Sequence, residues 1–326
     1  MAALKAYRPS PRRAGAGRRA PDPDFEARVR ASFARQGFMG RLGARIVALA
    51  PGRLAIALDH RPTLVQHLGH FHGGVVATLA DNAAGYAAFT LMPAGASVLT
   101  VEFKINFVAP AAGERLEARA VAVKRGRTLT VCESRVYAGG RRSSLCAIAL
   151  VSLMALPGRA DEPSAARPKA SGGPAYRAPA VDATLVPANP EFAAAVAGVY
   201  RRQPFGPELG FALDRIAPGL GQFSLPFRAD LTQQHGFFHG GVVATAADLA
   251  MGAAAGSLAP AGAAPVTVEF KLNLLAPAAG EVLTAYGTVL RPGRTVTICR
   301  ADVTAGSAGT ERLCATALGT MISVNI

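Results

Sequence analysis

The stretch Phe71-His72-Gly73-Gly74-Val75-Val76-Ala77-Thr78 decides the fold of this chain, because the same eight residues recur as Phe238 to Thr245. In both copies one aspartate, Asp81 or Asp248, stands nine residues after the histidine. It is the only charged side chain of a long apolar segment, 73–101 in the first copy and 240–268 in the second. Burying a carboxylate is costly unless it has a use. Its repeated placement indicates where the chemistry of the protein lies.

A constant offset of 167 residues aligns the two halves well beyond this stretch. It aligns Thr100 to Lys104 with Thr267 to Lys271, and Gly126-Arg127-Thr128 with Gly293-Arg294-Thr295. The offset predicts a tandem duplication of a domain of roughly 135 residues, an ordinary domain size and too long a period for a solenoid. The expected organisation is a basic tail at 1–21, a first domain at 22–157, a linker at 158–187 and a second domain at 188–326.

The composition favours a cytoplasmic protein without a membrane span. Half of the residues are hydrophobic, and the net charge at pH 7 is +14. Residues 1–20 contain six of the basic residues and no acid, so we expect a disordered basic tail. The four cysteines form no CxxC pair and are expected to be reduced and buried. No apolar signal segment is recognisable at the N-terminus.

Each half shows the same order of expected elements. Asp22-Pro23 and Asn189-Pro190 are typical helix starts, followed by amphipathic helices. Hairpins are expected around Gly52 and Gly219, followed by long apolar helices that begin near His72 and His239. Further strands are expected in the first half at 97–108, 114–124, 127–138 and 143–155.

The strand after the long helix alternates in character. Its apolar set is Val101, Phe103, Ile105 and Phe107, and its polar set, expected on the opposite face, is Thr100, Glu102, Lys104 and Asn106. A helix that is apolar nearly all round has to be enclosed. The pattern therefore predicts an α+β fold in which a curved antiparallel sheet wraps around a long central helix, twice in one chain.

The motif Gln66-x5-His72-Gly73-Gly74-x6-Asp81-Asn82, with Thr100 and Gly126-Arg127-Thr128 further on, resembles hotdog-fold acyl-CoA thioesterases of the PaaI type. The second copy, from Gln233 through His239 to Asp248, resembles them equally well, and the resemblance covers nearly all of both domains. It implies an intramolecular pair of hotdog domains that hydrolyses acyl-CoA to a free acid and CoA. No cofactor or metal is implied.

Thioester hydrolysis requires hydrogen-bond donors for the carbonyl oxygen, and a glycine at a helix N-terminus offers exposed N–H groups. Gly73 and Gly240 are the candidate oxyanion donors, and Gln66 and Gln233 would orient water or the carbonyl. An aspartate more than two turns into a helix cannot reach the start of that helix, so we expect it to serve the opposite half. One expected site combines Gln66, Gly73, Asp248 and Thr267; the other combines Gln233, Gly240, Asp81 and Thr100.

The aspartates would act as general bases on water or attack the thioester directly, and the sequence does not separate these mechanisms. Burial should raise their pKa values. A purely structural role, in which each acid specifies the pairing of the two halves, is the simpler alternative.

Further candidate substrate contacts follow from the resemblance. They are His72, His239, Gly74, Gly241, Asn82, Tyr86, Arg127 and Arg294. The histidines are interpreted as orienting the loop rather than transferring protons, and the two arginines either bind CoA phosphates or lie in solvated turns. Asn82, Ala84 and Tyr86 correspond to Leu249, Met251 and Ala253, so we expect the two sites to differ in acyl preference.

Other functions are disfavoured. The chain has neither a Gly-x-Ser-x-Gly elbow nor a phosphate-binding loop, and it has no nucleic-acid-binding motif. A non-catalytic acyl-CoA-binding hotdog protein is the alternative to a thioesterase. The sequence leaves open the acyl chain, further self-association of the paired domains, and any role of the basic tail.

Overall fold

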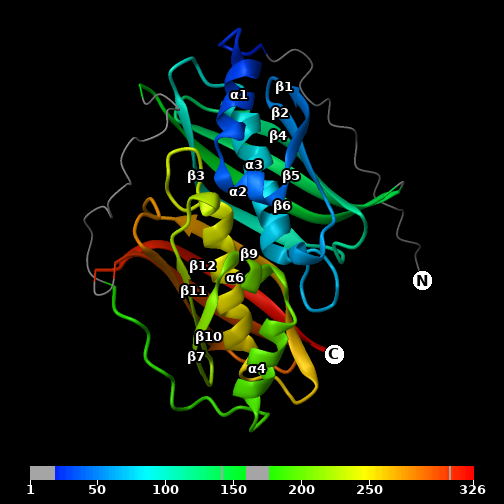
Figure 1. Ribbon diagram of the computed structural model, residues 1–326, viewed down its shortest axis with the longest axis vertical. Helices are drawn as coiled ribbons and strands as arrows, with labels where there is room; N and C mark the ends of the chain where they lie inside the picture. The colour runs from blue at the N-terminus through cyan, green and yellow to red at the C-terminus, as the bar shows by residue number, and fades with distance from the viewer. Residues whose placement is uncertain (1–18, 141, 159–175, 308–309) are drawn as a thin grey trace, which may run out of the picture.

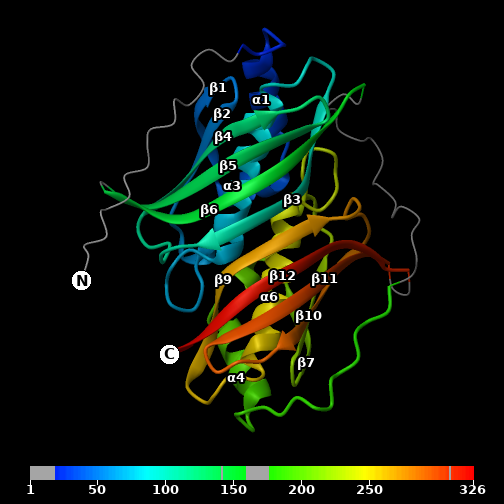
Figure 2. The same ribbon diagram turned by 180° about the vertical axis from the view of Figure 1, so that it is seen from behind.

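The structure is a computed structural model that describes residues 19–140, 142–158, 176–307 and 310–326. Most of the expected basic tail lies outside the described residues, as does the greater part of the expected linker. Figure 1 shows the chain with its long helices toward the viewer, and Figure 2 shows the strands from behind.

The two halves have the same elements in the same order. The first half contains α1 (Phe25–Ala34), α2 (Gly37–Leu42), β1 (Arg45–Ala50), β2 (Arg53–Asp59), the 3-10 turn η1 (Pro62–Leu64), α3 (Gly73–Phe89), β3 (Ser97–Phe107), β4 (Arg115–Arg125), β5 (Leu129–Gly139) and β6 (Ser143–Leu156). The second contains α4 (Phe192–Arg201), α5 (Phe205–Leu209), β7 (Ala212–Ala217), β8 (Leu220–Pro226), η2 (Ala229–Leu231), α6 (Gly240–Gly256), β9 (Ala263–Leu274), β10 (Val282–Arg291), β11 (Val296–Gly306) and β12 (Arg312–Asn325).

The strands form one continuous antiparallel sheet in the order β1-β2-β4-β5-β6-β3-β9-β12-β11-β10-β8-β7. The halves join where β3 pairs with β9, and in that pairing Lys104 lies directly opposite Lys271. These lysines are equivalent under the offset of 167, so the junction relates the halves by a pseudo-twofold axis. Helices α3 and α6 lie on one side of this sheet (Figures 1 and 2). The predicted double hotdog fold is confirmed.

The central helices are buried along their whole length. Every residue of α3 from Gly74 to Phe89 is buried, and α6 is buried except at Gly240 and Gly252. A helix enclosed in this way needs no amphipathic stripe, which explains its run of Ala, Val and Gly. All four cysteines are buried and none of them forms a disulfide bond, as the sequence indicates.

The first turn of each central helix touches the second turn of the other, and only glycine fits at this contact. A Cβ atom at Gly74 would overlap the side chain of Thr245, and one at Gly241 would overlap that of Thr78. These glycines, expected among the substrate contacts, therefore lie in the helix–helix contact. The close crossing carries the start of each helix to the middle of the other.

The predicted alternation of apolar and polar side chains along β3 is wrong at the beginning of the strand. In the pairing of β3 with β6, Thr100 lies opposite Leu153 and Glu102 opposite Ser152, so Val101 is an extra residue in a β-bulge. In the second half, Val268 is the extra residue between Thr267 and Glu269. A bulge shifts the alternation by one residue and re-aims the side chain before it. Thr100 and Thr267 consequently face the helices instead of the outer surface.

The expected helix starts at Asp22-Pro23 and Asn189-Pro190 are also displaced. Helix α1 begins at Phe25, and Asp22 accepts a hydrogen bond from the Asp24 N–H in the preceding turn. Asn189 accepts from the Glu191 N–H in the same way. These side chains shape the turn before the helix rather than cap its first residue.

Two helical glycines provide a matched test of the helix crossing. Gly74→Ala should lower the free energy of unfolding by about 1–3 kcal/mol, because its methyl group overlaps Thr245 in a closely packed contact. Gly252→Ala should be neutral or stabilising by up to about 1 kcal/mol, because no atom lies within 4 Å of the added carbon. Urea denaturation of both variants measures the difference. Equal stabilities would contradict the assigned contact.

Candidate active site

Each buried aspartate is held by a threonine from the strand that follows its helix. Thr267 Oγ1 donates a hydrogen bond to Asp248 Oδ1 at 2.7 Å, and Thr100 Oγ1 donates to Asp81 Oδ1 at 2.9 Å. The two aspartates are only 7% and 5% exposed, respectively. These hydrogen bonds can form because the β-bulges turn both threonines toward the helices. One oxygen of each carboxylate is therefore fixed, and the other remains for a different partner.

The second oxygen faces the first turn of the opposite central helix. A Cβ atom at Gly73 would lie 3.0 Å from Asp248 Oδ2, and one at Gly240 would lie 3.4 Å from Asp81 Oδ2. The N–H groups of Gly73 and Gly240 have no hydrogen-bond partner among the residues that the structure describes. Each carboxylate thus lies beside a free N–H group at the positive end of a helix dipole.

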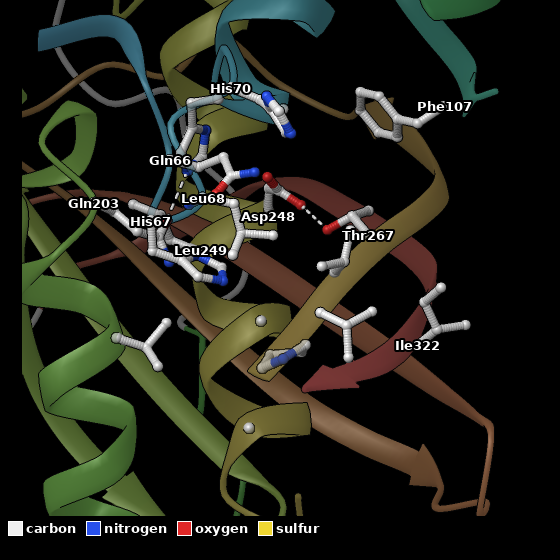
Figure 3. Close-up of a pocket in the computed structure, with 18 of the residues that line it drawn as sticks. Gln66, His67, Leu68, His70, Phe107, Gln203, Asp248, Leu249, Thr267 and Ile322 are labelled. Atoms are coloured by element: carbon white, nitrogen blue, oxygen red, sulfur yellow. Dashed lines mark hydrogen bonds between the residues drawn. The ribbon is translucent and has the colours of Figure 1, made fainter. Parts of the chain in front are cut away.

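A cavity of about 580 Å³ opens beside Asp248. Gly73 and the loop before it line one side, and α4, α6, β9 and β12 line the others. Figure 3 shows Thr267 bonded to Asp248 in this cavity, with Leu249 and Ile322 on its apolar walls. The site therefore combines a polar end at the carboxylate with a large apolar volume.

The two glutamines before the HGG turns occupy equivalent loops. Gln66 Oε1 accepts from the Leu68 N–H, and Gln233 Oε1 accepts from the His235 N–H. This bond orients each amide and leaves its Nε2 group as the donor. Gln66 lines the cavity, and in Figure 3 its side chain and the Asp248 carboxylate point into the same region.

The histidines cap the central helices. His72 Nδ1 accepts from the Gly74 N–H at 2.9 Å, so the neutral ring carries its proton on Nε2, which donates to Gln203 Oε1 at 3.1 Å. His239 Nδ1 accepts from the Gly241 N–H at the same distance. Burial lowers the pKa of both rings, that of His239 to about 4. Neutral histidine rings that are fixed by hydrogen bonds fit the expected role of orienting the loop.

The second site contains a buried amide network that the sequence did not reveal. His239 Nε2 lies 3.0 Å from the Asn82 side-chain nitrogen, which also contacts Gln36, while Asn82 Oδ1 has no partner among the described residues. Gln36 also contacts Gln234. Because Nε2 of His239 carries its proton, the Asn82 oxygen has to face the ring, and the Gln36 and Gln234 amides have to turn with it so that each nitrogen still donates to an oxygen.

Gln36 and Gln203 are candidate-site residues that were not predicted from the sequence. They are equivalent under the offset of 167, which was the available signal, but they follow helices that carry no motif. His67 was also passed over. It lines the cavity, and both of its ring nitrogens are buried without a partner among the described residues.

Burial also raises the pKa values of the two aspartates. It raises the pKa of Asp81 to about 6, and the hydrogen bond from Thr100 opposes that rise. Burial raises the pKa of Asp248 as well, against the opposing effects of His72 and the bond from Thr267. A carboxylate with a raised pKa is a stronger base near neutral pH.

The other expected substrate contacts lie away from the carboxylates' free oxygens. The Tyr86 hydroxyl bonds to Ser32 between α1 and α3 at 2.9 Å. Arg127 and Arg294 are exposed at the β4–β5 and β10–β11 turns, and neither lines the cavity.

None of the described helices is long and apolar enough to cross a membrane.

Comparison with known proteins places the fold and the site in context. Residues 68–145 and 235–311 both match the model of the Thioesterase superfamily. The chain is 30% identical over 118 residues to "Putative esterase VNG_1336C" of Halobacterium salinarum, covering 35% of this chain and 78% of that protein. It is 49% identical to a thioesterase family protein from Silicibacter pomeroyi, covering 41% of this chain and 99% of that one with a TM-score of 0.41.

A hot dog fold protein of unknown function from Alicyclobacillus acidocaldarius matches both halves together. It covers 90% of this chain and 98% of its own, with a TM-score of 0.56 at 12% identity, which shows a shared double fold. The match of each half to one family model, and the 30% identity to a relative that is largely covered, lead to one conclusion. The chain belongs to the thioesterase superfamily, as a protein with two tandem hotdog domains.

Proposed function

We propose that this protein hydrolyses acyl-CoA thioesters, of the kind that PaaI-type enzymes use, at two sites shared between its halves. The observation that carries the proposal is the approach of each buried Asp Oδ2 to the free N–H end of the opposite central helix. Hydrolysis of a thioester needs a base and an oxyanion donor on either side of one carbonyl group. Membership of the thioesterase superfamily supports the thioester substrate.

In the first site, the thioester carbonyl oxygen would accept from the Gly73 N–H, and the Gln66 amide would orient the attacking water. Asp248 takes a proton from that water as the new C–O bond forms, and the helix end stabilises the oxyanion. Collapse of the intermediate breaks the C–S bond, and the departing thiolate takes the proton from Asp248. Direct attack by Oδ2 would use the same geometry and form a mixed anhydride.

The second site repeats these roles with Gly240, Gln233, Asp81 and Thr100. Thr100 and Thr267 are positioning residues, because they fix Oδ1 and leave Oδ2 toward the substrate. The exposed arginines at the β4–β5 and β10–β11 turns are proposed to contact CoA phosphates.

Replacing the aspartates tests the proposal directly. The double variant Asp81→Asn/Asp248→Asn should stay folded and lose at least about 100-fold in kcat/KM, since a positioned base contributes about that much or more. Each single variant should retain the turnover of the intact site. Release of CoA from an acyl-CoA panel, followed with a thiol reagent, measures this. Wild-type rates in the double variant would refute the catalytic assignment.

The pH dependence of the Asp81 site can be isolated in the Asp248→Asn variant. Because the acid must be ionised, kcat/KM should rise with pH and level off above about pH 6, where His239 is already neutral. Adding Thr100→Val removes the bond that lowers the Asp81 pKa, so the inflection should move to higher pH. Thr267→Val in the same background affects the disabled site and should not move it. An inflection near pH 4 would contradict a buried base.

The buried charge should also cost stability. The folded-state pKa of Asp81 lies above its ordinary value of 3.8, so stability is lost as the pH rises from there through about 6. Asp81→Asn should therefore raise the free energy of unfolding at pH 8 by an amount on the order of 1–3 kcal/mol, and the gain should vanish near pH 4. Asp59→Asn, at a surface ion pair with Arg45, serves as the control and should change stability by no more than about 1 kcal/mol. Destabilisation by Asp81→Asn at pH 8 would be the contrary result.

A further inference from the structure

The cavity beside Asp248 extends along α6 beneath α4, where several small residues line it beside the larger Val196, Val199 and Tyr200 of α4. Ala253 and Gly256 of α6 line it, together with Ala195 of α4. Gly252 also lines it, and a Cβ atom there would meet no atom within 4 Å. A helix-interior glycine without a close neighbour has no packing reason to be glycine. Here it leaves volume that a ligand can enter.

Three of these four small-residue positions carry large side chains in the first half, and the fourth, Gly252, corresponds to Gly85. Tyr86 stands where the second half has Ala253, Phe89 where it has Gly256, and Arg28 where it has Ala195. Tyr86 and Phe89 are 2% and 0% exposed. The space between α1 and α3 that corresponds to the cavity wall is therefore occupied by protein.

These side chains are fixed by specific contacts. The Tyr86 hydroxyl bonds to Ser32 of α1, and the Tyr86 and Phe89 rings lie edge to face at 6.0 Å between centroids. The Arg28 guanidinium lies 4.2 Å from the centre of the Phe89 ring, and it bonds to Asp22 at 2.7 Å and to the Met92 carbonyl at 2.9 Å. A cluster held at both ends cannot swing aside for a ligand without losing these bonds.

The residue after each aspartate also differs between the two halves, and it is apolar in the half that has the open cavity. Leu249 lines the cavity one residue after Asp248, whereas its equivalent, Asn82, lies in the buried amide network with Gln36. The expected difference at Ala84 and Met251 has no part in this, because neither residue lines the cavity and Met251 packs against Gly319 of the sheet.

We propose that the two sites divide substrates by acyl size. The Asp248 site accepts a medium or long acyl chain in the cavity between α4 and α6, and the Tyr86–Phe89–Arg28 cluster restricts the Asp81 site to short acyl groups. This inference rests on the proposed hydrolysis of acyl-CoA for its biological meaning, but the difference in available volume exists without it.

Non-hydrolysable thioether analogues test the inference independently of catalysis. Isothermal titration of the wild-type protein should give one S-octyl-CoA bound per chain and two S-ethyl-CoA. Gly252→Phe places a ring in the cavity and should lower the octyl-to-ethyl affinity ratio at least about tenfold, while the matched control Gly252→Ala should change it little. Two octyl ligands per chain, none, or an unchanged ratio in a folded Gly252→Phe variant would overturn the proposal.

The single aspartate variants assign the sites and do not depend on the folding of Gly252→Phe. Asp81→Asn should release CoA from octanoyl-CoA, and Asp248→Asn should release it from acetyl-CoA but at least about tenfold more slowly from octanoyl-CoA. Equal octanoyl-CoA rates in the two variants would overturn the division while leaving the thioesterase proposal intact. If the wild-type protein binds one octyl ligand but hydrolyses no acyl-CoA, the thioesterase proposal fails and the difference in acyl size between the two sites stands.

Discussion

The contact between the two central helices is the constraint on which the other features depend. Gly74 and Gly241 let the first turn of each helix press against Thr245 or Thr78 of the other. Any larger residue would separate the helices and move each N-terminus away from the opposite aspartate. A single crossing therefore fixes the pairing of the halves, the continuity of the sheet through β3 and β9, and the geometry of both sites.

The same crossing explains why two costly carboxylates are tolerated. A buried acid is usually paired with a cation, yet the hydrogen-bond donor to Asp81 and to Asp248 among the described residues is a threonine hydroxyl, and the end of a helix lies beside it. The helix end supplies a partial positive charge without a mobile side chain, and it leaves one carboxylate oxygen free. Under the proposed function, the local loss of stability supplies a reactive carboxylate, and the tightly packed sheet and helices around it can support that loss.

The fold could be predicted because a repeated pattern of apolar residues is a property of the chain itself. The long apolar helix and the later strands follow from it, and the offset of 167 related the halves. The β-bulges at Val101 and Val268 could not be predicted, because an extra residue alters the register without altering residue type. Gln203 reaches His72 directly, and Gln36 reaches His239 through Asn82, only once the ends of α1 and α4 are placed against the opposite half.

The fusion of the two halves has a physical consequence for specificity. In a homodimer with twofold symmetry, every substitution in the pocket wall appears in both sites, so a cavity and a filled pocket cannot coexist. One chain removes that restriction, and the pairs Arg28/Ala195, Tyr86/Ala253 and Phe89/Gly256 have diverged around cores whose Gly, Asp and Thr residues remain the same. The filled pocket also gives the first half a firmly packed contact between α1 and α3. One half can thus contribute rigidity while the other keeps the open volume.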